Sequence, residues 1–148
     1  MKSKRLHAYQ VMLRVARVKE IRASMVLAEA TTAENRQRIQ HDYIVDAREA
    51  VVAASRRQRA HQGDLDLDRY EMLTRLSEAL DDRLNDAKSA LSAAGELSRE
   101  RAVASVTATR HRENIAEHVD VACQTLEQER SANAREDAIE LWLKGKSR

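Results

Sequence analysis

The chain contains no proline and only three glycines in 148 residues, so almost nothing in it interrupts a helix. Charged residues make up 34% of the chain and aromatic residues 3%, a mixture typical of long helices with large exposed faces. β-Strands need runs of β-branched and aromatic residues bounded by Gly and Pro, and such runs are missing. We therefore expect a single all-α domain.

One segment near the middle has the composition of a turn. Gly63 suits the C-cap of a helix, and Asp64, Asp66 and Asp68 suit the N-cap and first turn of the next one. This predicts a helix over 4–61, a turn over 62–66 and a helix over 67–143. Helices of that length in a domain of residues 1–148 must pack side by side. The expected fold is a long two-helix antiparallel coiled-coil hairpin whose C-terminal helix is longer than its N-terminal one.

The second helix carries a heptad seam that alternates steps of three and four residues, the spacing of a coiled coil. Apolar residues dominate both ends of the seam, and polar ones interrupt it over 98–112, where we expect looser packing. The predicted seam residues are Tyr70, Leu73, Ser77, Leu80, Leu84, Ala87, Leu91, Ala94, Ser98, Arg101, Ser105, Ala108, Arg112, Ile115, Val119, Ala122 and Leu126.

The first helix is apolar on a broader face near its start, and no single heptad covers its apolar residues. A helix that is apolar on more than one side is expected to have more than one neighbour. The residues in question are Leu6, Tyr9, Val11, Met12, Leu13, Val15, Val18, Ile21, Met25 and Leu27.

Charge is segregated along the chain, although its net value is only +2. Residues 1–24 hold seven basic side chains and the single acid Glu20, and residues 64–86 hold eight acids and three bases.

A turn near Gly63 leaves the chain beyond about 127 without a helix to pack on. That overhang carries an apolar cluster, which makes it a candidate contact surface; the cluster is Ile139, Leu141, Trp142 and Leu143.

The sequence shows no catalytic constellation: it has no Gly-rich phosphate loop, no CxxC and no HExxH. We expect no enzymatic activity, no cofactor and no metal site.

The small net charge argues against a dedicated nucleic-acid binder. No apolar run approaches the roughly 18 residues of a membrane span, and the N-terminus lacks the features of a signal peptide. With the lone Cys123, these features indicate a cytoplasmic protein with no direct membrane insertion.

Three segments together resemble the FliJ/YscO family, the central stalk proteins of flagellar and virulence type III secretion ATPases. They are the basic and apolar segment 9–20 with Ala28-Glu29-Ala30, the segment 70–80 after the turn, and the C-terminal segment 136–141. The resemblance implies an antiparallel coiled coil that inserts its terminal end into an ATPase hexamer and stimulates it. It also implies contact with the cytoplasmic domain of the export gate at the inner membrane, and it allows export chaperones as a further partner.

At the terminal end, the residues that match the ATPase contact combine long basic side chains with exposed apolar ones. Such side chains suit a shaft that touches several subunits in turn. An alternative interpretation is that these arginines only balance Glu127, Glu129 and Glu136 on the returning helix. The predicted ATPase contacts are Arg14, Arg17, Lys19, Arg22, Leu141 and Trp142.

The resemblance places the gate contact on the helix just after the turn. Met72, Leu76, Ala79 and Arg83 step by four, three and four, so they form one stripe beside the seam. Tyr43 of the first helix is expected alongside the stripe. The alternative is that Met72 and Leu76 only widen the seam against the first helix. The patch departs from an aromatic-rich version at Met72 and Arg83.

Two other classes of function compete with the stalk. One is a generic coiled-coil adaptor or dimerisation module with unrelated protein partners, which predicts a stable dimer or tetramer. The other is a helical rod bound to nucleic acid through its basic N-terminal stretch, which predicts binding that falls steeply with salt. A stalk must fit one pore and therefore predicts a monomeric hairpin.

Overall fold

Two helices make up the computed structural model, which describes residues 2–60 and 66–147. α1 runs from Lys2 to Ala60 and α2 from Leu67 to Lys146, so the second helix is the longer one. This confirms an all-α hairpin with a longer C-terminal helix. The predicted cap Gly63 lies outside the described residues.

Local signals account for the helix ends beside the turn. Asp66 is the N-cap of α2: its Oδ1 accepts a hydrogen bond from the backbone N–H of Arg69 at 3.2 Å, and its carbonyl accepts one from Tyr70 N–H at 2.9 Å. Asp68 lies in the first turn of α2, and Arg57 and Arg59 lie in the last turn of α1. Each charge has the sign that the helix dipole favours there.

The helices form two compact units, Met25–Val103 and Met1–Ser24 with Ala104–Arg148. We call them the loop unit and the terminal unit. In the loop unit, Arg48 of α1 forms an ion pair with Asp81 of α2, and Glu34 lies beside Gly95. Partner numbers on α2 rise as those on α1 fall, so the two segments are antiparallel.

The core of the loop unit is one layer of side chains between two helices. Ile44, Leu84 and Ala87 form its buried cluster, and Val45 and Leu80 pack against it. Leu73 is buried as well. A single layer between two helices encloses few side chains fully, so we expect the free energy of unfolding to be modest.

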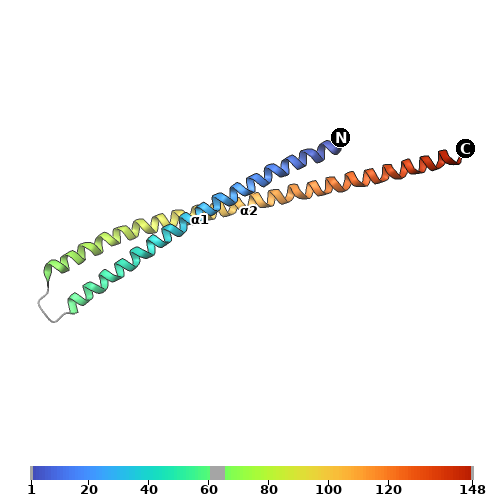
Figure 1. Ribbon diagram of the computed structural model, residues 1–148. Coiled ribbons are helices and arrows are strands. Elements are labelled where there is room, and N and C mark those ends of the chain that lie inside the picture. Colours follow the sequence, from blue (N-terminus) through green and yellow to red (C-terminus); the bar gives the residue numbers. More distant parts are fainter. Residues whose placement is uncertain (1, 61–65, 148) are drawn as a thin grey trace. The chain divides into compact units, whose positions relative to one another are not determined.

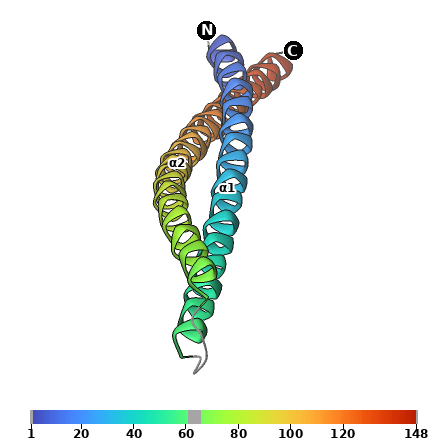
Figure 2. The ribbon, with the colours of Figure 1, turned by 90° about the vertical axis from the view of Figure 1, so that its left-hand side faces the viewer.

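The terminal unit pairs the start of α1 with the second half of α2. Lys2 forms an ion pair with Glu129, the rings of Tyr9 and His118 stack with centroids 5.7 Å apart, and Glu20 contacts Arg112. These pairs again run antiparallel, and both chain ends lie at the same end of this unit (Figure 2).

The predicted seam of α2 is buried or half-buried at every position except one. Arg101 is exposed and Ala102 is half-buried in its place. Ser98 and Ser105 on either side are small, and a guanidinium is costly to desolvate, so the neighbouring methyl group takes the inward position.

One heptad does not cover the apolar residues of α1, as predicted, because Val11, Val15 and Val18 are exposed. The packed face of α1 nevertheless follows strict steps of three and four, with Val45, Ala47, Val52 and Ala54 half-buried beside it, and polar side chains occupy much of that face. The residues are Leu6, Tyr9, Leu13, Ala16, Glu20, Ala23, Leu27, Ala30, Glu34, Gln37, His41, Ile44, Arg48, Val51, Ser55 and Gln58.

Candidate functional site

An exposed apolar stripe runs along α1 of the terminal unit. Val11, Val15, Val18 and Ile21 are each 44–60% exposed, and their spacing of four, three and three residues places them on one face of the helix. The packed face of α1 at Leu13, Ala16 and Glu20 points elsewhere. These are four of the ten residues that the sequence placed on a broad apolar face, and α2 does not cover them. Four others of the ten are half-buried, namely Leu6, Tyr9, Leu13 and Leu27.

The four basic residues of the predicted ATPase contact lie beside this stripe. Arg14, Arg17, Lys19 and Arg22 are all exposed, and none of them forms an ion pair within the part of the chain that the structure describes. Their charges are therefore available to an external partner.

The alternative role for these bases, balancing acids on the returning helix, finds no support in the ion pairs. Glu129 pairs with Lys2, and neither Glu127 nor Glu136 forms an ion pair with a described residue. The single acid of the first 24 residues, Glu20, pairs with Arg112 and not with a neighbouring base of α1.

The C-terminal part of α2 extends past the start of α1, as predicted. Glu129 is the last half-buried residue, and every described residue from 131 to 147 is exposed. Figure 1 shows this end of α2 beyond the start of α1. Trp142 is 59% exposed and Leu141 is 71% exposed. The Lys146 ammonium lies 4.0 Å from the centroid of the Trp142 ring, a cation–π contact within one turn.

The predicted ATPase contacts share one unit but do not form one patch. Lys2 faces Glu129, so Arg14 lies twelve residues to one side of that pair and Leu141 twelve residues to the other. At 1.5 Å per residue, each is about 18 Å from the pair along the helix axis. The terminal unit thus offers two separate exposed surfaces, one basic and apolar and one apolar.

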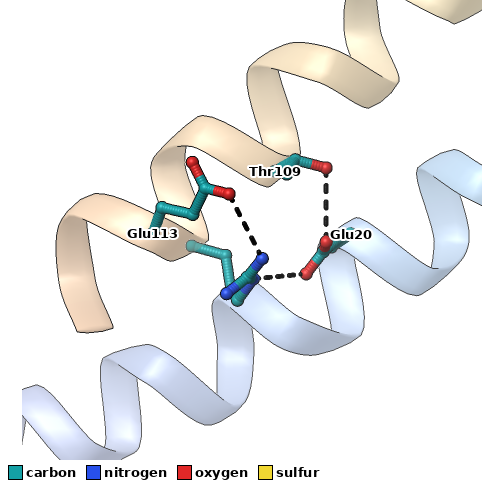
Figure 3. A network of polar contacts seen from close by, with 4 residues as sticks. Glu20, Thr109 and Glu113 are labelled. Carbon is teal, nitrogen blue, oxygen red and sulfur yellow. Dashed lines mark hydrogen bonds and ion pairs between the residues drawn. The ribbon is translucent and has the colours of Figure 1, made fainter. Parts of the chain in front are cut away.

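A polar cluster that the sequence did not predict holds the terminal unit together. Arg112 Nε lies 2.8 Å from Glu20 Oε2, and Thr109 Oγ1 donates to Glu20 Oε1 at 3.2 Å (Figure 3). Arg112 Nη2 is also 3.6 Å from Glu113 Oε1. Glu20 is seven residues from Leu13 and from Leu27, and that heptad spacing was the signal that could have revealed its inward position.

The predicted gate contacts are exposed on α2 of the loop unit. Met72 is 61% exposed and Leu76 is 44% exposed, and Ala79 and Arg83 are exposed too. The neighbouring seam residue Leu73 is buried instead. The stripe is therefore separate from the seam, and the alternative that Met72 and Leu76 widen the packing against α1 is wrong.

Tyr43 lies near one end of this stripe. It is 74% exposed, and it lines a shallow surface hollow together with Arg83 and Asp86 of α2 and with Gln37 and Gln40 of α1. Tyr43 and Arg83 therefore line the same surface hollow.

Among the described residues, no group of three or more His, Cys, Asp or Glu side chains is arranged to hold a metal ion. Neither described helix has a segment that is both long enough and apolar enough to cross a bilayer.

No protein-family model, curated protein or solved structure matches this chain.

Proposed function

We propose that this chain is a non-enzymatic stalk and regulator of a type III secretion ATPase. Its terminal end would enter the ATPase hexamer, stimulate ATP hydrolysis and link the ATPase to the export gate. The proposal places the protein in the cytoplasm, at the periphery of the inner-membrane secretion apparatus, and export chaperones are a further candidate partner.

The observation that carries the proposal is the exposed basic and apolar face of α1 in the terminal unit. Four basic side chains that form no ion pair with another described residue flank an apolar stripe on a helix that is already packed on its other side. A shaft inside a ring has to contact several subunits without binding one of them tightly. Long basic side chains with apolar stems suit this, because their head groups can move between acidic partners.

A second contact, with the cytoplasmic domain of the export gate, is proposed for the stripe of Met72, Leu76, Ala79 and Arg83 with Tyr43. An exposed apolar stripe beside a coiled-coil seam is a surface that a groove in another protein can accept. Because this stripe belongs to the loop unit and the basic face to the terminal unit, the two partners would not compete for the same residues.

The test for the ATPase contact is ATP hydrolysis by the type III secretion ATPase of the same organism, with and without this chain. We expect stimulation, and we expect Arg14→Glu with Arg17→Glu to abolish it. Arg56→Glu with Arg59→Glu is the matched control, because these two arginines are exposed as well but belong to the loop unit. If both variants lose ATPase stimulation equally, the generic coiled-coil adaptor is favoured. The same holds if the native chain neither stimulates ATP hydrolysis nor promotes hexamer formation.

The gate contact can be tested separately by measuring binding of the export-gate cytoplasmic domain. Leu76→Glu should weaken binding and leave ATPase stimulation unchanged. Leu97→Glu is the control, because Leu97 is 43% exposed against 44% for Leu76 and lies on the same helix outside the stripe. If Leu76→Glu and Leu97→Glu change binding of the export-gate domain equally, or if neither changes it, the proposed gate contact at this stripe is wrong.

A further inference from the structure

The outward face of α1 in the terminal unit carries a line of three valines. Val11, Val15 and Val18 are 44–50% exposed, and their directions from the helix axis fall within about 60° of one another. Leu13 and Ala16, which lie on the packed face of α1, point to the opposite side of the helix. The three valines therefore face away from α2.

Basic side chains surround these valines. Lys4 and Arg22 lie in line with them, before and after, and Arg14 and Lys19 lie about 70° to either side of that line. All four basic side chains are exposed, and none forms an ion pair with another described residue. The single acid of this stretch, Glu20, is turned inward toward α2. The face is thus apolar in its centre and basic around it, with no acid.

The composition of this face argues against two kinds of occupant. A second copy of the chain would place bases against bases, which is destabilising. A nucleic acid would satisfy the bases, but most of its contacts with proteins are to polar phosphate and sugar groups, and the valines would meet no apolar group there. The surface that fits this face has negative charge over an apolar layer.

We infer that this face of α1 lies on an anionic lipid bilayer when no protein partner covers it. Helices in a bilayer interface bury an apolar face at the boundary between head groups and acyl chains, and they carry Lys and Arg beside that face. The valines reach this boundary, and the four bases extend their aliphatic stems along it while their charged ends stay among the lipid phosphates. Each base near such a surface strengthens binding about fivefold.

The line of valines is short and contains no aromatic residue. The association should therefore be reversible, and it should weaken as salt screens the charges. This inference goes beyond the proposed function and does not depend on it. Because the same side chains serve both contacts, a bilayer and an ATPase would exclude each other on this face.

The experiment is flotation of the full chain with vesicles, made either of equal parts phosphatidylglycerol and phosphatidylcholine or of phosphatidylcholine alone. The chain should bind the anionic vesicles and not the neutral ones. Lys19→Glu with Arg22→Glu should weaken binding about thirtyfold or more, because two attractive charges become repulsive. Arg56→Glu with Arg59→Glu is the matched control: it changes the net charge equally, but on exposed residues of the loop unit, and should bind like the native chain.

Contact between the valines and the apolar layer is tested by fluorescence in a Trp142→Phe background, which removes the chain's one tryptophan. The emission of Val15→Trp should shift to shorter wavelength when anionic vesicles are added. Val121→Trp is the control and should show no shift, because Val121 is 60% exposed on the other helix of the same unit.

No binding to anionic vesicles at low salt, or equal binding to the two kinds of vesicle, would overturn the inference. Equal losses in the two charge-reversal variants would do so as well. An unchanged emission of Val15→Trp on vesicles that bind the chain would show that the valines do not reach the apolar layer, and the inference would be wrong. No ATPase is present in these measurements, so a failure here leaves the proposed function to its own test.

Discussion

Arg112 Nε lies 2.8 Å from Glu20 Oε2, within the face that α1 and α2 share in the terminal unit (Figure 3). Both side chains are more than two-thirds buried, with 27% of Glu20 and 29% of Arg112 exposed. The pair takes a heptad position that leucine usually takes in a coiled coil. It therefore replaces an apolar layer with a directional contact.

A double-mutant cycle of Glu20→Ala and Arg112→Ala should give a coupling energy of about 1 kcal/mol, above the value for an exposed pair. The reason is that partial burial reduces screening by solvent. Urea unfolding followed by circular dichroism measures it. The control cycle is Glu71 with Arg75, an ion pair within α2 whose side chains are 62% and 77% exposed, and its coupling should be about 0.3–0.5 kcal/mol. Equal couplings in the two cycles would contradict the packed position of Glu20.

Gly95→Ala should raise the free energy of unfolding by about 0.5–1 kcal/mol. Gly95 is a helix-interior glycine in α2, and alanine restricts the unfolded chain and has a higher helix propensity. A Cβ built there would lie 3.5 Å from Glu34 Oε1, an ordinary contact with the end of a flexible side chain. Thermal unfolding of the two proteins measures the difference.

Gly145→Ala is the control for this substitution. Nothing lies within 4 Å of a Cβ at Gly145, and its position near the end of α2 makes the helix around it prone to fraying. Its effect on the melting temperature should be smaller than that of Gly95→Ala. A decrease in stability for Gly95→Ala would mean that Glu34 cannot move away from the new methyl group.

Leu84→Ala should destabilise the chain by about 2–3 kcal/mol, since Leu84 belongs to the buried cluster with Ile44 and Ala87. Leu76→Ala, on the exposed stripe of the same helix, should cost about 0.5 kcal/mol or less. Chemical denaturation of both variants gives the comparison. A cost for Leu76→Ala close to that of Leu84→Ala would show that the stripe is part of the packing and not a free surface.

Ending the chain after Arg130 should change the melting temperature by less than about 2 °C at low protein concentration. Every described residue from 131 to 147 is exposed, so its removal takes away almost no buried apolar area. Differential scanning calorimetry of the two chains measures the shift. A large drop in melting temperature would show that the segment packs on its own chain.

Sequence reasoning predicted the packed face of α2 far better than that of α1. In α2 most of the predicted heptad positions are apolar, and every one of them except Arg101 is buried or half-buried. In α1 the two patterns diverge: Val11, Val15 and Val18 are apolar but exposed, and Glu20, Glu34 and His41 are polar but packed. Apolar character was therefore a misleading guide to the interface of α1.

By itself the sequence determined the helical class, the two long helices and the unpaired C-terminal segment. These follow from the absence of proline, from helix propensity and from the position of the turn, all of which are local properties of the chain. Which face of α1 meets α2 depends on the packing between the two helices. Both faces of α1 carry apolar groups, so the choice depends on which side chains fit against α2. Small residues such as Gly95 leave room for Glu34, and Arg112 offers a charge to Glu20. That choice left the basic and apolar face of α1 exposed, and the proposed function rests on that face.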